Sequence, residues 1–280
     1  MQQAPKSLFV KMGCSSIWLV PELAAGPGPA LLADPDGLFL RAECEIVKDQ
    51  KKIRVGRLPL EIGGAVRRVY LKRYNVFSWR YRLGSLWMAS GAARSWIGAN
   101  LLLEAGFRTG RPLAAVECRS GGLLTKSFYL SEEVPGARTA DDYWRQELSR
   151  SGGTGGFRRR RGFLARLAEL FRALHGRGLY HNDLKDANIL TLPDGAVETF
   201  YLLDLEGIRR YRSLSRRRQI KNVVQLNRTL GRFLRAPEKL FWLKVYLGEG
   251  FAHRNEKRRW IRQILVESRR RDRLSLRKGN

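Results

Sequence analysis

The stretch GLYHNDLKDANIL, residues 178–190, gathers acids, amides and a lysine within a single turn of the chain. Its most notable residues are Asp183, Lys185 and Asn188, and apolar residues flank them on both sides. Carboxylate and amide groups are costly to hold together unless a cation or a reacting hydroxyl group lies among them. An ordinary surface turn is also rich in Asn and Asp, which explains the composition but not the order of residues. We therefore interpret this stretch as a catalytic loop.

Two residues outside the loop complete a set that is suited to phosphoryl transfer. Lys72 ends the strand-like segment VYLK, and Asp204 ends the strand-like segment YLLD. The order strand lysine, His-x-Asp-Leu-x-x-x-Asn and then Asp is the order of parts that a kinase needs. Asp183 would accept the proton of the attacking hydroxyl group, and Lys185 would reach the transferred phosphoryl group. Asn188 and Asp204 would bind Mg²⁺ through oxygen atoms, and Lys72 would neutralise the α- and β-phosphates of ATP.

Within the same loop, His181 is expected to hold the turn together by hydrogen bonds rather than to react. A second glycine-rich stretch, SGGTGG at residues 151–156, is not followed by Lys and Ser or Thr. It therefore fails as a phosphate-binding loop, and we expect a flexible connector there.

The elements around these residues predict an α+β fold of the two-lobed protein-kinase type. Alternating apolar and polar residues indicate antiparallel strands, with a turn at Gly63–Gly64, in five segments: 38–47, 52–58, 65–74, 112–118 and 126–134. A helix is expected at residues 92–105, with Gly106 as its C-terminal cap. After Pro135 the pattern becomes helical, and an apolar face between Phe163 and Leu174 predicts a long helix that ends at Gly176.

These elements give three expected parts. Residues 1–36 form a poorly patterned N-terminal segment. Residues 37–134 form a kinase-like N-lobe, a small antiparallel β-sheet with one main helix. Residues 135–280 form a mostly helical C-lobe with a basic C-terminal tail.

The charge of the chain indicates a polyanionic partner. The sequence holds 53 Lys and Arg against 26 Asp and Glu, a net charge of +27. Most of the excess lies in residues 209–280, which carry 23 basic and 5 acidic residues, a net charge of +18. Nucleic acid, an anionic membrane face and an acidic or phosphorylated glycan all fit this charge.

The cysteines and the apolar runs bear on the compartment. Cys14, Cys44 and Cys118 are odd in number and show no CxxC spacing, so we expect neither a disulfide framework nor a zinc site but a reducing cytosol. No run of about 18 apolar residues predicts a membrane-spanning helix. The apolar stretch IWLV stops at Pro21 and is too short for the core of a signal peptide.

The chain resembles the Kdo/WaaP lipopolysaccharide kinase family of Gram-negative bacteria over roughly residues 40–250. The segments that carry the resemblance follow the family's order: VKDQKKIRVGRLPL, VYLKRYN, ARSW, LEAGFRTGRPLAA, SFYLSEEV, YHNDLKDANIL, YLLDLEG, NVVQLNRTLGRFLR and FWLKVYL. Like that family, the chain lacks the G-x-G-x-x-G loop of protein kinases and has KDQKK at its first β-turn.

This resemblance implies transfer of phosphate from ATP, with Mg²⁺, to a sugar hydroxyl of the lipopolysaccharide inner core. It places the enzyme in the cytoplasm, as a peripheral protein on the cytoplasmic face of the inner membrane. On the same basis we assign Glu132 and Val134, in SFYLSEEV, to nucleotide binding together with Lys72.

Two positions depart from the family pattern. The family tends to have a Glu just before the Trp of its first helix, where it would pair with the strand lysine, but here Ser95 precedes Trp96. Glu104 lies on the opposite face of that helix, because nine residues at about 100° each turn it away. Lys72 would then be steadied by the phosphates or by an acid such as Glu61.

The second departure is Glu206 in the tripeptide DLE, where protein kinases have Gly. An additional metal ligand and a solvated surface acid explain it equally well.

Other interpretations stay open at this point. Lys185 after Asp183 favours a protein Ser/Thr kinase, whereas the missing helix Glu favours a pseudokinase or an RNA-binding module that uses the basic tail. We expect no DNA partner, and RNA only under that last alternative. Residues 75–87, NVFSWRYRLGSLW, mix aromatic residues with Arg, as an interfacial segment does, but packing between lobes explains the aromatic residues almost as well.

Overall fold

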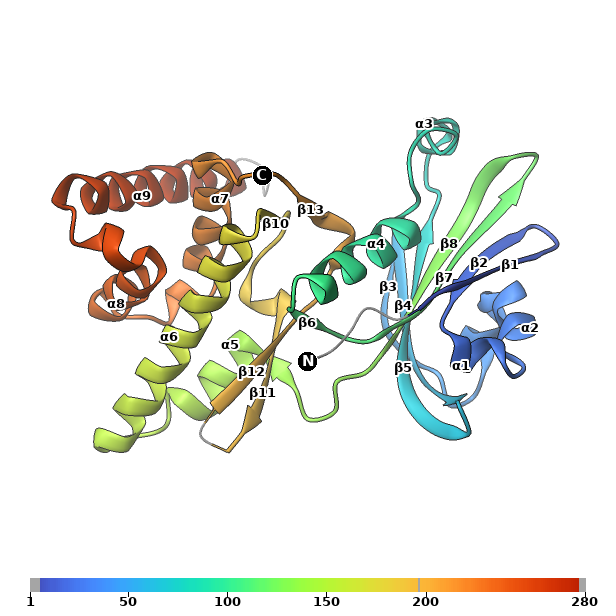
Figure 1. Ribbon diagram of the computed structural model, residues 1–280, viewed down its shortest axis with the longest axis horizontal. Coiled ribbons are helices and arrows are strands. Elements are labelled where there is room, and N and C mark those ends of the chain that lie inside the picture. Colours follow the sequence, from blue (N-terminus) through green and yellow to red (C-terminus); the bar gives the residue numbers. More distant parts are fainter. Residues whose placement is uncertain (1–5, 196, 277–280) are drawn as a thin grey trace. The chain divides into compact units, whose positions relative to one another are not determined.

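The computed structural model describes residues 6–195 and 197–276, with side chains up to residue 274. The chain divides into two compact units (Figure 1). Unit 1 comprises the chain up to Pro135 together with Asp204–Ile208, and unit 2 comprises Gly136–Leu203 and the chain from Arg209 onward. Among the described residues, no helix is both long enough and apolar enough to span a membrane.

Unit 1 is built on a seven-stranded antiparallel sheet in the order β1-β2-β7-β8-β5-β4-β3. The bounds of its strands are β1 (Leu8–Met12), β2 (Ser15–Leu19), β3 (Glu45–Gln50), β4 (Ile53–Ile62), β5 (Ala65–Asn75), β7 (Pro112–Ser120) and β8 (Leu123–Glu132). A two-residue strand, β6 (Arg108–Thr109), follows the main helix. The helical elements of the unit are α1 (Pro21–Ala24), α2 (Gly28–Ala33), η1 (Pro35–Leu40), α3 (Trp79–Gly84), α4 (Gly91–Glu104) and η4 (Leu205–Gly207). The loosely patterned N-terminal segment thus contributes two strands to the sheet.

Local signals in the sequence account for the turn and the helix of unit 1. Gly63 and Gly64 have φ of +56° and +78° and join β4 to β5, as the Gly pair predicts. α4 begins where the Ser90 hydroxyl accepts a hydrogen bond from the Ala93 backbone N–H at 3.0 Å. The helix ends in a Schellman motif in which Gly106 has φ of +76°, so the predicted cap is confirmed.

The position of α4 fixes the segment Asp204–Ile208 within unit 1. α4 packs on β5, β7 and β8 and contacts η4. Gly98 makes this approach possible, because a Cβ atom at Gly98 would lie 2.2 Å from the Leu205 carbonyl oxygen. A side chain at this position would therefore push the Asp204 segment away from the helix.

Unit 2 is mainly helical and carries a small antiparallel sheet. Its strands include β11 between β9 and β12. Strand bounds are β9 (Arg138–Thr139), β10 (Leu179–His181), β11 (Ile189–Asp194), β12 (Val197–Leu202) and β13 (Ile208–Arg210), the last of which starts in unit 1. The helical elements are α5 (Ala140–Tyr143), η2 (Trp144–Leu148), α6 (Gly153–Gly176), η3 (Asp186–Asn188), α7 (Arg216–Arg228), η5 (Leu230–Arg232), α8 (Ala236–Leu247), η6 (Gly248–Phe251) and α9 (Arg254–Leu276).

The core of unit 2 forms around α6. Phe163, Leu167 and Phe171 on its predicted apolar face are fully buried, and the helix packs on α8. Aromatic rings continue the core toward α9, with centroid separations of 5.3 Å between Phe171 and Trp242 and 5.4 Å between Tyr246 and Trp260. The helix also begins earlier than the sequence suggests, at Gly153, so the expected flexible connector is instead its first turn.

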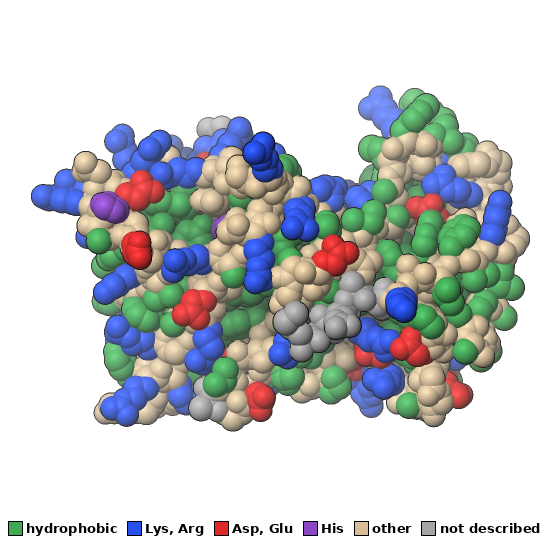
Figure 2. Space-filling view, viewed as in Figure 1, with side chains coloured by type: hydrophobic (Ala, Val, Ile, Leu, Met, Phe, Trp, Pro, Cys, Tyr) green, Lys and Arg blue, Asp and Glu red, His purple; other side chains and the backbone are tan. Residues whose placement is uncertain are grey.

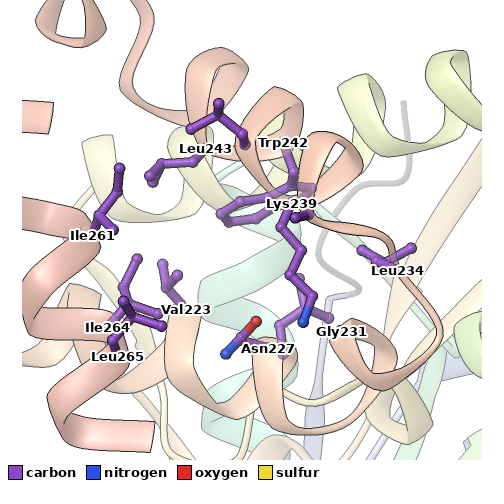
Figure 3. Close-up of a pocket in the computed structure, with 13 residues that line it drawn as sticks. Val223, Asn227, Gly231, Leu234, Lys239, Trp242, Leu243, Ile261, Ile264 and Leu265 are labelled. Carbon is purple, nitrogen blue, oxygen red and sulfur yellow. The ribbon is translucent and has the colours of Figure 1, made fainter. Parts of the chain in front are cut away.

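An apolar cavity of about 280 Å³ lies between α7, α8 and α9 (Figure 3). Trp242 and Leu243 line it from α8, and Ile261 and Ile264 line it from α9. None of the residues with predicted chemistry lines this cavity. The residues predicted to act in catalysis lie instead at the end of β10.

Candidate active site

The predicted catalytic loop leaves β10 and runs through η3 into β11. Gly178 directs the chain into β10 with φ of +70°, and a Cβ atom there would lie 2.0 Å from the Tyr211 carbonyl oxygen. This backbone approach is closed by a hydrogen bond from the Tyr211 N–H to the Gly178 carbonyl at 2.9 Å. The entrance to the loop is thus fixed by a glycine that no other residue can replace without displacing backbone.

His181 fastens the start of the loop. Its ring is buried; Nδ1 accepts a hydrogen bond from the Asp183 backbone N–H at 3.1 Å, and Nε2 donates to the Leu203 carbonyl at 2.7 Å. With both ring nitrogens engaged in this way, the imidazole holds the loop, as expected from the sequence.

The structure brings Asp183, Lys185 and Asn188 together. Lys185 Nζ lies 2.8 Å from Asp183 Oδ2. The Asn188 amide Nδ2 donates to the Asp183 backbone carbonyl at 2.8 Å and to Asp183 Oδ2 at 3.3 Å. All three side chains are partly exposed, so the group can be reached from solvent. A partly exposed carboxylate oriented by a lysine and an amide can accept a proton from a hydroxyl group.

The remaining acid of the loop has a different environment. Asp186 is buried, and its Oδ1 accepts a hydrogen bond from the Ala187 backbone N–H at 2.8 Å. Burial raises the pKa of the Asp186 carboxyl group, an effect that hydrogen bonds from Ala187 and Thr229 partly offset. Asp186 therefore stabilises the turn and leaves Asp183 as the accessible acid.

Gln225 on α7 supports the loop, although it was not among the residues predicted to act in the site. Its Oε1 accepts a hydrogen bond from the Leu184 N–H at 3.3 Å. Its Nε2 donates to the Asn182 carbonyl at 2.7 Å and to Asp183 Oδ1 at 3.4 Å. A single neutral amide thus contacts three consecutive residues of the loop and orients the Asp183 carboxylate.

A second amide on α7 extends this support into the core. Asn222 is fully buried and donates through Nδ2 to the His181 carbonyl at 2.6 Å and to Gln225 Oε1 at 2.9 Å. Its Oδ1 faces His175 Nε2 at 3.2 Å, and His175 Nδ1 lies 2.7 Å from the Tyr246 hydroxyl. The signal in the sequence is a pair of amides three residues apart within the apolar stripe of α7.

His175 is neutral in this network. Burial lowers the pKa of its imidazole to about 4, an effect that the hydrogen bond to Asn222 opposes only in part. The neutral ring carries one proton, which Nε2 donates to the Asn222 oxygen, so that Nδ1 accepts from the Tyr246 hydroxyl. α6, α7 and α8 are therefore linked beneath the loop by neutral groups.

In unit 1, Lys72 pairs directly with Asp204. Lys72 Nζ lies 2.8 Å from Asp204 Oδ1 and 4.9 Å from the centroid of the Tyr74 ring. Burial lowers the pKa of the Lys72 ammonium group, but Tyr74, Asp204 and Glu206 together outweigh burial and raise this pKa above its ordinary value. Lys72 is thus a charged group with a defined carboxylate partner.

The partner of Lys72 differs from the sequence-based expectation. The pairing register places Lys72 opposite Val55, so Glu61 lies six residues further along β4, about 20 Å away. Glu61 is exposed. The acid that steadies Lys72 comes instead from Asp204, which is 132 residues away in the chain.

Ser95 contributes to the Lys72 environment through Tyr74. Only 1% of Ser95 is exposed, and its hydroxyl lies 2.7 Å from the Tyr74 hydroxyl. α4 therefore contacts the ring beneath Lys72 rather than the ammonium group itself. The missing helix Glu is explained by this arrangement, in which the carboxylate is supplied by Asp204.

Asp204 has an unusual backbone conformation. Its φ is 57° and its ψ is 56°, and it is the one residue other than glycine with a positive φ in the part of the chain that the structure describes. A left-handed backbone is tolerated by Asp better than by most residues, and such strain is concentrated at functional sites. Glu206, two residues further on, is half-buried and pairs with Arg94 of α4 at 3.5 Å.

The two other residues predicted to bind nucleotide lie at the end of β8. The Glu132 carboxylate is 3.5 Å from both Arg67 and Arg111, and its backbone N–H donates to the Arg111 carbonyl at 2.9 Å. Val134 follows the strand and is half-buried. Their role in nucleotide binding stays a prediction.

A family model supplies the comparison that identifies the chain. The model of the lipopolysaccharide kinase (Kdo/WaaP) family matches residues 62–244, more than half of the sequence. The chain belongs to the lipopolysaccharide kinase (Kdo/WaaP) family. The matched range contains Lys72, Asp183, Asn188 and Asp204, and it makes this lipopolysaccharide kinase a phosphotransferase.

The fold of this lipopolysaccharide kinase also matches a solved structure, "WaaP in complex with acyl carrier protein". The similarity has a TM-score of 0.60 and 20% sequence identity, and it covers 85% of this chain and 92% of that one. It confirms the predicted α+β, kinase-like fold. No curated protein matches the chain.

Kinases use a divalent cation, and the predicted ligands of this lipopolysaccharide kinase have suitable chemistry. The Asn188 Nδ2 donates to Asp183, and the Asn188 Oδ1 accepts no hydrogen bond within the described residues, so this oxygen is available to a cation. Asp204 offers a carboxylate already oriented by a cation. No cluster of three or more His, Cys, Asp and Glu side chains suited to a metal is present among residues 6–195 and 197–276. A sparse set of oxygen ligands is typical of Mg²⁺, which keeps waters and binds phosphates of the substrate.

Proposed function

We propose that this lipopolysaccharide kinase transfers the γ-phosphoryl group of ATP to a sugar hydroxyl of the lipopolysaccharide inner core. The observation that carries the proposal is the carboxylate of Asp183, which Lys185, Asn188 and Gln225 orient together in a partly exposed loop. An accessible oriented carboxylate beside a mobile cation is what an attacking hydroxyl group requires.

Each residue of the loop has a distinct task in this proposal. Asp183 accepts the proton of the sugar hydroxyl as its oxygen attacks phosphorus. Lys185 already lies against Asp183 Oδ2, and its flexible side chain moves to the negative charge of the transferred phosphoryl group. His181 and Gln225 keep the backbone still during this exchange, so that the reaction does not have to reorganise the loop.

The residues of unit 1 are assigned to the nucleotide. Lys72 neutralises the α- and β-phosphates, and Glu132 and Val134 contact ATP at the end of β8. Asp204 and Asn188 hold Mg²⁺, which supplies charge neutralisation of the phosphates when it is bound. To contact the phosphates, Lys72 would give up its ion pair with Asp204, while the Tyr74 ring would remain beneath the ammonium group.

We further propose that the enzyme works in the cytoplasm, attached to the cytoplasmic face of the inner membrane. The segment around α3 supports this proposal, because Trp79 and Trp87 are 68% and 83% exposed and Phe77 is also exposed. Arg80 lies beside Trp79 in a cation–π contact of 5.7 Å. Exposed aromatic residues interleaved with Arg are typical of segments that lie in a lipid headgroup region.

The test follows the label from ATP that is labelled at its γ-phosphate. The purified protein is incubated with Mg²⁺ and each of three acceptors separately: deacylated lipopolysaccharide core, a basic peptide mixture rich in Ser and Thr, and buffer alone. We expect label in the core saccharide, removable by a phosphatase. Label in the peptide alone would identify a protein kinase, and label in neither acceptor would favour the pseudokinase or RNA-binding interpretation.

Asp194→Asn is the matched control for Asp183→Asn in this assay. Asp194 is an exposed acid at the end of β11, on the same unit, and it lines no part of the loop. The control should label the saccharide as the wild type does. Equal transfer by the Asp183→Asn variant would contradict the proposed function.

A further inference from the structure

α7 and α9 border a groove of about 1330 Å³ in unit 2 whose walls are strongly basic. Eight of its fourteen lining residues are Arg or Lys, and one is acidic. Those from α7 are Arg216, Arg217, Arg218 and Lys221, and those from α9 are Arg259, Arg262, Arg270 and Arg271. Lys and Arg side chains gather over these two helices (Figure 2). The groove therefore brings eight basic side chains together at one place.

Several of these cations have no acidic partner among the residues that the structure describes. Arg270 and Arg271 pair with Glu267, and Arg216 pairs with Glu256. By contrast, Arg217, Lys221 and Arg262 form no ion pair within the part of the chain that the structure describes. Unpaired cations that line one groove repel one another, so an anionic ligand bound there would reduce this repulsion.

The N-terminus of α7 adds to this unsatisfied charge. The helix opens with three consecutive arginines, residues 216–218, and its first turn contains no acid. Basic residues in the first turn oppose the helix dipole and lower helix stability. An anion bound in the groove would offset both the dipole and the mutual repulsion of the arginines.

The groove begins at the catalytic loop. Lys221 Nζ donates to Asn182 Oδ1 at 2.8 Å and lies 5.3 Å from the centroid of the Tyr180 ring. Tyr180 is itself a lining residue, and Asn182 directly precedes Asp183. A ligand that lies along the groove is therefore held next to the residue that accepts the proton.

The outer part of the groove combines charge with exposed apolar side chains. Val266 lines the groove, and a neighbouring hollow on α9 is lined by Val266 and Leu274 together with Arg269, Arg270 and Arg273. Both apolar residues are exposed. Arginine beside exposed aliphatic residues fits a lipid surface better than it fits RNA, which is bound by aromatic stacking and a basic groove.

We propose that the α7–α9 groove is the acceptor-docking site, in which arginines bind phosphate groups on the headgroup of the glycolipid. This inference rests on the proposed function and names the surface to which the acceptor binds. The guanidinium fork of Arg matches phosphate oxygens two at a time, so Arg217 and Arg262 are the expected anchors. Lys221 then directs the sugar toward Asp183.

The first experiment measures binding without ATP, so it does not depend on catalysis. Phosphatidylcholine vesicles that carry a small fraction of lipopolysaccharide are floated with the wild type, with an Arg217→Gln/Arg262→Gln variant and with an Arg254→Gln/Arg258→Gln variant. The last variant removes the same charge from exposed positions of α9 outside the groove. We expect the groove variant to bind about thirtyfold more weakly, since each basic residue near an anionic surface contributes a factor of about five.

The control variant should lose less than the groove variant, and vesicles with dephosphorylated lipopolysaccharide should bind the wild type weakly. Equal losses in the two variants would overturn the groove as a site. The groove would also be ruled out as a glycolipid site if inorganic phosphate competed for vesicle binding as effectively as lipopolysaccharide does. Salt-sensitive binding of RNA without binding to the vesicles would replace the glycolipid with a nucleic acid.

The second experiment measures transfer to the vesicle-borne acceptor. The groove variant should raise the KM for the glycolipid by a similar factor and leave the KM for ATP unchanged. A variant that binds vesicles weakly but retains the wild-type KM for the glycolipid would overturn the docking role. If the wild type transfers no phosphate, the proposed function fails, but the binding experiment still tests whether the groove binds the glycolipid.

Discussion

The two units hold their functional carboxylates by different physical means. In unit 1, Asp204 has a strained backbone and a direct ion pair with Lys72 at 2.8 Å. In unit 2, Asp183 also has an ion pair at 2.8 Å, with Lys185, and two neutral amides, those of Gln225 and Asn188, contact its carboxylate as well. Both carboxylates thus lie against an opposite charge, and that of Asp183 is in addition held by a neutral scaffold.

This difference fits the role that we propose for each carboxylate. An ion pair in a partly exposed site can exchange one partner for another, because phosphate or metal replaces the lost Coulomb energy. Neutral amides orient a carboxylate without adding opposite charge, which suits the proton acceptor that we propose Asp183 to be. Unit 1 is thus arranged for exchange of partners, and unit 2 for constant geometry.

The strongest test of this comparison is Asp183→Asn. The substitution preserves the shape of the side chain but replaces one carboxylate oxygen with an NH2 group, so it removes one of the two amide contacts and the proposed proton acceptor. We expect the rate of phosphoryl transfer to fall by about 10²–10⁴-fold while nucleotide binding is retained. Single-turnover assays and ATP titration measure the two quantities separately, and weak ATP binding in this variant would place Asp183 with the nucleotide instead.

The neutral scaffold makes a prediction about pH. The pKa of His175 is about 4 in the folded protein against an ordinary value of 6.5, so the unfolded chain binds a proton that the folded chain rejects between these values. Neutral His175 therefore does not lower the stability of the folded protein above pH 6.5. As the pH falls from 6.5 toward 4, protonation of the unfolded chain lowers the free energy of unfolding by up to about 3 kcal/mol. Denaturant titrations across this range should show the loss.

His253 supplies the control for this prediction, because it is exposed on the same unit. His253→Gln should keep the pH dependence of the wild type. His175→Gln should be less stable at neutral pH and lose much less stability on acidification. A His175→Gln variant with the full wild-type pH dependence would show that other groups produce it.

Several parts of the site could be predicted from local sequence. The spacing of Asp183, Lys185 and Asn188 defines one turn, and residues so close in the chain meet whatever the rest of the fold does. Gly106 was predictable for the same reason, since a helix that ends in a left-handed residue prefers glycine. Short-range geometry therefore carried most of the correct assignments.

Other parts depend on contacts that no local pattern encodes. The Lys72–Asp204 pair joins residues 132 positions apart, and it forms because Gly98 lets the Asp204 segment approach α4. The stretch at residues 151–156 looks like a connector, but Arg160 binds the Leu148 and Ser151 carbonyls and so stabilises the start of α6. Such effects arise only after the chain has folded.

Replacement of Asp204 tests the exchangeable half of the comparison. Asp204→Ala removes a predicted metal ligand and leaves Lys72 without its carboxylate, so we expect Mg²⁺-dependent binding of ATP to weaken by at least about tenfold. Asp49→Ala is a suitable control, because it breaks an exposed ion pair with Arg54 in the same unit. Calorimetric titration with and without Mg²⁺ distinguishes the two, and equal affinities would move the metal ligand elsewhere.

The smallest expected effect concerns the neutral half, at Gln225. Gln225→Met keeps the length of the side chain but removes its hydrogen bonds to Asn182, Asp183 and Leu184. We expect kcat to fall by about three- to tenfold, because a hydrogen bond contributes about 0.5–1.5 kcal/mol and the loop remains fastened by His181.

The two Michaelis constants should stay close to their wild-type values, since we expect Gln225 to act through the loop and Asp183 rather than on either substrate. Gln219→Met on the same helix removes an amide that donates to the Leu214 carbonyl outside the loop, and it should leave kcat unchanged. A Gln225→Met variant with wild-type kcat would mean that Lys185 and Asn188 suffice to orient Asp183. The amide of α7 would then add nothing to the ion pair and to the Asn188 contact, and the contrast between the two units would be weaker.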